Sequence, residues 1–96
     1  MGAYHQTQRD DLEKGQLVWV EPEVGDIANT ARILKREGNL WVVDSFVYAR
    51  DRFKRLTRTR TAWVWCKSLS SGRLHDFHED ELTLHQPTPN EEGVTE

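Results

Sequence analysis

Apolar and polar residues alternate over short stretches between residues 15 and 85, and a period of two is typical of β-strands. The first stretch, "GQLVWVEP", opens at Gly15, closes at Pro22 and is rich in residues that favour strands. Turn residues such as Glu-Gly-Asn at 37–39 separate the stretches. Several short strands joined by turns predict an all-β fold, a small antiparallel β-barrel of five to six strands. We predict strands at residues 15–22, 30–36, 40–48, 61–67, 73–77 and 83–85.

Two further segments have features of helices. In residues 49–56, Phe53 and Leu56 are three apart, as on one face of a helix, so a helix competes there with an irregular loop. We predict a short helical turn at residues 78–82, because Asp76 and Glu79 have the spacing of a capping box.

The two ends of the chain differ from its middle. Residues 1–14 are polar and show no sustained periodicity, which predicts a flexible N-terminal segment. Residues 86–96 combine two prolines with acids and small polar residues, a composition typical of a disordered acidic tail. We therefore expect one folded domain, residues 15–85, in this chain of 96 residues.

The composition predicts a cytoplasmic protein. Charged residues make up 30% of the chain, and no apolar run reaches the roughly 20 residues that a membrane span needs. The N-terminal residues lack the apolar segment of a secretion signal. A lone cysteine, Cys66, cannot form a disulfide within the chain and suits a reducing compartment. A membrane is therefore not an expected partner.

Positive charge is concentrated in one short segment. Residues 50–60 hold six basic residues and one acid, although the formal net charge of the chain is -3. Residues 76–96 hold seven acids and no lysine or arginine. Arginine suits phosphate because its planar guanidinium donates two hydrogen bonds at once. The candidate binding residues of this segment, the basic arm, are Arg50, Arg52, Lys54, Arg55, Arg58 and Arg60.

Strand alternation predicts where the tryptophans point. If Ala62, Val64 and Cys66 face the core, Trp63 and Trp65 face outward, beside the basic arm. In the same way Val18 and Val20 point inward and Trp19 outward. Residues 40–42 are ambiguous, with Leu40 and Val42 inside if Trp41 points out. The competing interpretation is that the tryptophans fill the core of a small domain.

Arginines beside outward tryptophans indicate binding of single-stranded nucleic acid, because bases stack on aromatic rings and cations neutralise phosphates. The expected partner is RNA or single-stranded DNA, bound by the basic arm with Trp63 and Trp65 as stacking residues. Three alternatives stay open. The first is a solvated loop whose cations face the chain's own acids, and the second is docking on an acidic protein surface, as in a phage-type adaptor. The third is weak self-association in place of a monomer.

The motifs "GQLVWV", "ARI", "LWVV" and "GRLHDFHEDELTL" together resemble the SH3-like barrels of the Tudor and KOW type. In those families a glycine opens the first strand, Ala-x-Ile marks the second, and a helical turn with an acid and a leucine precedes the last. The resemblance implies a non-enzymatic module that binds nucleic acid, a modified side chain or a protein. Asn29 and Thr30 stand where a methyl-binding aromatic cage would need an aromatic, which argues against that ligand. The basic arm is then an insertion between strands three and four.

Catalytic and metal sites are not expected. The chain has no nucleophile elbow, phosphate-binding glycine loop or zinc-protease helix. His75 and His78 would share a face only on a helix, and no zinc-site spacing accompanies them. Cys66 lies in an apolar strand, as a buried small hydrophobe does. We therefore predict a binding module with no cofactor.

Overall fold

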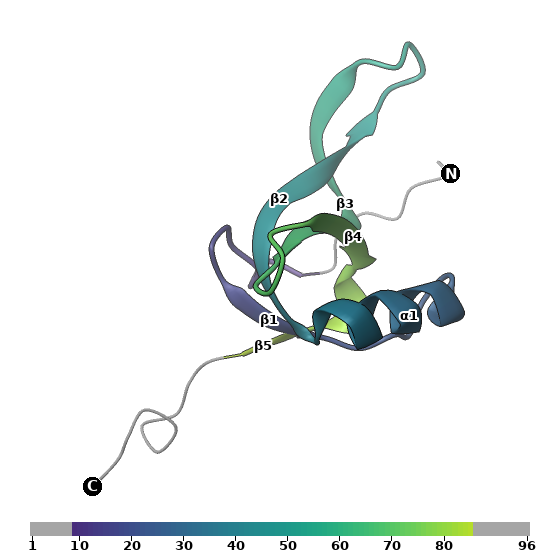
Figure 1. Ribbon diagram of the computed structural model, residues 1–96. Helices are drawn as coiled ribbons and strands as arrows, with labels where there is room; N and C mark the ends of the chain where they lie inside the picture. Colours follow the sequence, from purple (N-terminus) through teal and green to yellow (C-terminus); the bar gives the residue numbers. More distant parts are fainter. Residues whose placement is uncertain (1–8, 86–96) are drawn as a thin grey trace, which may run out of the picture.

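The computed structural model describes residues 9–85, which form one antiparallel sheet and one α-helix (Figure 1). Both predicted tails fall largely outside these residues. The elements in chain order are β1 (Leu17–Val20), α1 (Ile27–Glu37), β2 (Leu40–Arg50), β3 (Leu56–Ser68), β4 (Leu74–His78), the 3-10 helix η1 (Glu79–Glu81) and β5 (Leu82–Leu84).

The sheet confirms the all-β fold class. Its five strands lie in the order β4-β3-β2-β1-β5, and every neighbouring pair is antiparallel. The outer strands β4 and β5 do not pair with each other, so the sheet curls without closing into a hydrogen-bonded barrel. Figure 1 shows this curl, with α1 packed at its lower end.

The strand predicted at residues 30–36 is wrong, because this segment is the middle of α1. Asp26 caps the helix by accepting a hydrogen bond from the amide of Asn29, and Gly38, at φ 88°, ends it by donating to the carbonyl of Leu34. Ile33 and Leu34 are adjacent and both contact the core, which a strand with alternating faces does not allow. The Ala-x-Ile of the resemblance therefore lies on a helix.

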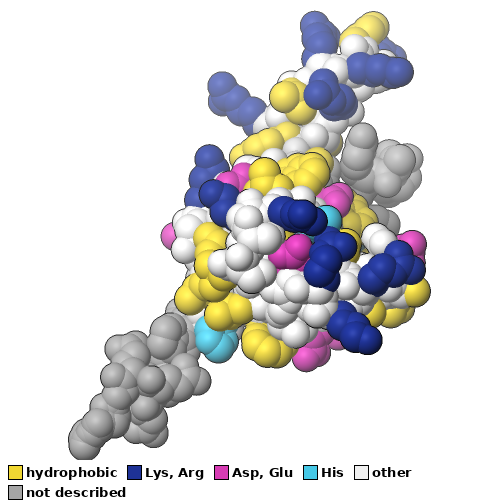
Figure 2. Space-filling view, in the orientation of Figure 1, with side chains coloured by type: hydrophobic (Ala, Val, Ile, Leu, Met, Phe, Trp, Pro, Cys, Tyr) yellow, Lys and Arg dark blue, Asp and Glu magenta, His cyan; other side chains and the backbone are white. Residues whose placement is uncertain are grey.

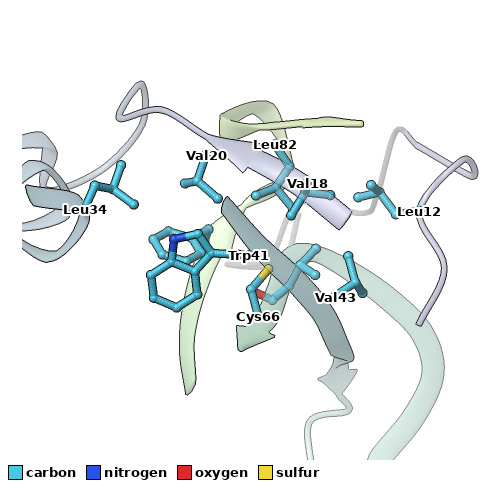
Figure 3. Packing of buried hydrophobic residues seen from close by; sticks show 10 residues of the cluster. Leu12, Val18, Val20, Leu34, Trp41, Val43, Cys66 and Leu82 are labelled. Carbon is cyan, nitrogen blue, oxygen red and sulfur yellow. The ribbon is translucent and has the colours of Figure 1, made fainter. Parts of the chain in front are cut away.

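The hydrophobic core lies inside the curl (Figure 3). Val18 and Val20 are buried with Trp19 outside, as predicted, and Ala62, Val64 and Cys66 are also buried. Trp41 is fully buried, so the orientation with Leu40 and Val42 inside is wrong. Its ring meets Phe77 edge to face at 4.9 Å, and its Nε1 donates to the carbonyl of Gly38 at 2.9 Å.

Two segments outside the strands are held firmly to this core. Leu12 is only 2% exposed and Arg9 donates to the carbonyls of Glu79 and Leu82, so the flexible segment expected at residues 1–14 is packed from Arg9 onward. The carboxylate of Glu81 accepts from the amides of Glu23 and Val24, which anchors the loop that leads into α1.

The helical turn before the last strand is present, but its cap differs from the prediction. The capping box is formed by His78 and Glu81 in place of Asp76 and Glu79. His78 Nδ1 accepts from the amide of Asp80, and the Glu81 carboxylate accepts from the amide of His78. The turn starts later than expected because β4 runs on to His78.

The basic segment is neither an irregular insertion nor a helix. Strand β2 extends to Arg50 and β3 begins at Leu56, so all but five residues of the connection belong to a long two-stranded ribbon. Threonine side chains support the ribbon, since Thr57 and Thr61 donate to the carbonyls of Ala49 and Val47, both at 2.9 Å. Register shifts along β2 and β3 mark bulges, which increase twist and bend a ribbon. Figure 1 shows it projecting beyond the rest of the sheet.

Candidate nucleic-acid interface

The basic arm forms the outer part of the β2–β3 ribbon. Figure 2 shows Lys and Arg side chains gathered on this projection with apolar side chains among them. Residues 50–60 hold six basic residues against Asp51, while the other described residues hold seven basic and twelve acidic residues. The positive charge is thus carried away from an acidic body, which separates the two signs in space as well as in sequence.

The six basic side chains differ in how far the protein engages them. Within residues 9–85, Arg52, Lys54 and Arg58 are exposed and make no side-chain hydrogen bond or salt bridge. Arg50 donates to the carbonyl of Lys54 at 2.7 Å. Arg55 is the arm residue that pairs with an acid, Asp51, at 3.2 Å. The acids of residues 9–85 therefore leave most of the charge of the arm unpaired.

Arg60 lies at the base of the arm and is held in a fixed position. Its guanidinium carbon lies 3.8 Å from the centroid of the Phe46 ring, a close cation–π contact. Its Nε and Nη2 atoms are buried and have no hydrogen-bond partner among the described residues. Buried unsatisfied donors cost about 1–3 kcal/mol each, so this arrangement lowers stability unless something outside the described chain accepts from them.

The tip of the arm is a rigid turn built around Asp51. Its carboxylate accepts from the amides of Phe53 at 2.8 Å and Arg55 at 3.0 Å, and its carbonyl accepts from the amide of Lys54 at 2.8 Å. The backbone amide of Arg55 is the largest cause that lowers the pKa of Asp51, so the carboxylate stays charged at neutral pH. Lys54 takes the left-handed φ of 65° that closes the turn.

Aromatic side chains accompany the arginines, but they differ from the predicted ones. Tyr48 pairs with Arg60 across the ribbon, and Phe53 stands at the tip. Trp65 is 39% exposed and Trp63 is half-buried against His78, with ring centroids 5.3 Å apart. Both tryptophans alternate with Val64, which pairs with Phe46, so they lie on the face opposite to the one that holds Arg60.

Sequence reasoning missed Phe46, Tyr48 and Phe53 because it looked for aromatics after the basic segment. A usable signal was present in "FVYARDRFKRL", where aromatic and basic residues alternate on both sides of a turn. A ribbon folds the two sides together, so residues far apart in that string become cross-strand neighbours.

His75, His78 and Cys66, the residues of the body with the most reactive side chains, have structural roles. Among residues 9–85, no group of three or more His, Cys, Asp or Glu could hold a metal ion. His75 lies edge-on to Trp41, and His78 caps η1. Burial raises the pKa of the Cys66 thiol to about 12, which keeps it protonated and unreactive. None of the helices in the described part of the chain is long and apolar enough to cross a membrane.

Comparison with known proteins assigns no family. No family model matches this chain, and neither the curated proteins nor the solved structures include a significant match.

Proposed function

We propose that this protein is a non-enzymatic module that binds nucleic acid through the basic arm. The observation that carries the proposal is the projecting ribbon, on which Arg52, Lys54 and Arg58 are exposed and unpaired within the described chain. Cations displayed in this way neutralise phosphates and release condensed counterions on binding. Tyr48 and Phe53 supply exposed rings on the same arm, on which the bases of a single strand can stack.

The SH3-like resemblance supports the proposal in part. The short turn η1, with its acids and Leu82, precedes the last strand as in the Tudor and KOW barrels. We infer an open SH3-like sheet in which α1 replaces the expected second strand and the arm is added between β2 and β3. Trp63 and Trp65, on the face opposite to Arg60, are not assigned to the nucleic-acid site.

A titration of the full chain tests the proposal. A labelled 20-nucleotide single strand, as DNA and as RNA, and the corresponding DNA duplex are titrated at low salt by fluorescence anisotropy. Backbone NMR follows the same titrations, and the amide signals of residues 48–60 are expected to shift first. If no oligonucleotide binds at low salt, or if only amides of the body respond, the proposal is wrong.

A second candidate function, a protein-interaction adaptor, is favoured by the outer face of the sheet, which is the face turned away from the hydrophobic core. Trp19 and Trp65 are 40% and 39% exposed there, and Leu74 is 47% exposed. Cross-strand pairing places Leu17, Val42, Lys67 and Leu74 in one row across four strands. Recovery of a stoichiometric protein after nuclease treatment, and its loss in the Trp19→Ala, Trp65→Ala variant, would favour this function over the first.

A further inference from the structure

Phe53 occupies the most exposed part of the arm. Its side chain is 64% exposed at the tip of the ribbon, and Figure 2 shows apolar atoms at that end among the basic side chains. An isolated exposed ring is common on protein surfaces and indicates nothing by itself. Phe53 differs from such a ring in its charged neighbours and in the way the turn holds it.

Two guanidinium groups flank the ring of Phe53. The guanidinium carbons of Arg52 and Arg55 lie 5.2 and 5.1 Å from its centroid, within cation–π range. Arg52 precedes the ring on this short turn and Arg55 follows it, so the two guanidiniums can reach phosphates on both sides of a base that the ring contacts. The residue nevertheless stays accessible to a ligand, since 64% of its surface is exposed.

The turn holds the backbone that carries this ring in one conformation. The hydrogen bonds of the Asp51 carboxylate to the amides of Phe53 and Arg55 hold the backbone on both sides of the ring. The amide of Asp51 also donates to the carbonyl of Arg55 at 2.9 Å, which closes the loop. Binding through this ring therefore costs little backbone conformational freedom, because the turn is ordered before the ligand arrives.

We propose that Phe53 is a base-stacking residue, which packs against the face of a nucleobase while Arg52 and Arg55 contact the adjoining phosphates. This inference rests on the proposed function and adds which side chain contacts the base. The exposed base can come from a single strand or from a duplex step that the ring opens as an apolar wedge. The same chemistry serves both sources.

Leu56 provides a matched control for this proposal. It is 63% exposed, nearly the same fraction as Phe53, and lies three residues further along the same tip. Its aliphatic side chain cannot stack, so its removal tests the loss of exposed apolar area alone. Phe53→Leu and Phe53→Trp test the ring itself, and backbone NMR spectra confirm that each variant folds.

The experiment measures the affinity of the full chain for a single strand, a duplex and an abasic single strand of equal length and phosphate number. Stacking on an aromatic ring is worth roughly 1–3 kcal/mol per base, so Phe53→Ala should weaken binding to base-containing strands roughly 5- to 150-fold. Phe53→Leu should weaken it nearly as much, whereas Phe53→Trp and Leu56→Ala should bind like the parent. In the complex, ring-current shifts should move the Phe53 ring protons upfield.

The outcomes separate this proposal from the proposed function. A parent that binds, with Phe53→Ala unchanged or equally weakened on the abasic strand, overturns base stacking and leaves arm binding intact. A parent that binds no oligonucleotide overturns both. A loss confined to the single strand identifies unpaired bases as the ligand, and a loss confined to the duplex identifies an opened base step.

Discussion

The salt dependence of nucleic-acid binding is the most direct measure of how many arm cations contact phosphate. Arg52, Lys54 and Arg58 are the arm residues whose side chains are exposed and make no hydrogen bond or salt bridge within the described chain. We therefore choose the triple variant Arg52→Gln, Lys54→Gln, Arg58→Gln. It leaves the Asp51–Arg55 pair that closes the turn in place.

The expected magnitude follows from counterion release. Each phosphate contact contributes about 0.7 to the slope of log affinity against log salt for a single strand and about 0.9 for a duplex. Three contacts therefore contribute about 2.1 to 2.7 to the slope. Between 50 and 200 mM salt, the parent should lose ~20- to 40-fold more affinity than the triple variant. Fluorescence anisotropy at four or five salt concentrations measures both slopes.

A control variant with the same change of net charge separates phosphate contacts of the arm from the general effect of net charge on binding. Lys14, Lys35 and Arg73 are exposed on the body and lie outside the arm, and their replacement with Gln also changes the net charge from -3 to -6. The control should keep the parent slope. Equal slopes for the parent and the arm variant, or an equal reduction in the control, would refute the assignment of these three cations to phosphate contacts.

Three further predictions concern the body of the protein. Hydrogen bonds lower the pKa of Glu37 to about 2, and the bond from the Ser71 hydroxyl contributes most. The ionised carboxylate therefore stabilises the fold fully above about pH 4.5, and this stabilisation is lost as the pH falls towards 2. Urea unfolding at several pH values should show that acid lowers the free energy of unfolding less in Glu37→Gln than in the parent. Trp41→Ala should lower the free energy of unfolding by roughly 3–5 kcal/mol, and Trp19→Ala, at a residue that is 40% exposed, should lower it by about half as much or less, which denaturant titration can compare. Because its thiol is buried and its pKa is raised, Cys66 should react with a thiol reagent in guanidinium chloride and not in the native protein; rapid native labelling would contradict the burial.

The strands could largely be predicted because their pattern is local. Val18 and Val20 alternate with Trp19, and Ala62, Val64 and Cys66 alternate with tryptophans, so the buried face follows from a period of two. The helix α1 could have been recognised from Asp26 and Gly38 at its ends, but Ile33 and Leu34 are its main apolar contacts, and so few apolar positions specify a period poorly. The orientation of Trp41 was ambiguous because residues 40–43 are all apolar, so no polar residue marks which face of the strand points to solvent.

The sequence by itself determined the chemical content of the candidate site, since six cations within eleven residues require no fold to be recognised. Only the tertiary structure decided which groups accompany them. Cross-strand pairing in the ribbon brings Arg60 over Phe46 and Tyr48 beside Arg60, and the same alternation turns Trp63 and Trp65 to the other face. The physical reason is that the charge of a side chain follows from its residue type, whereas its face and its neighbours depend on the register, bulges and turns that form between strands.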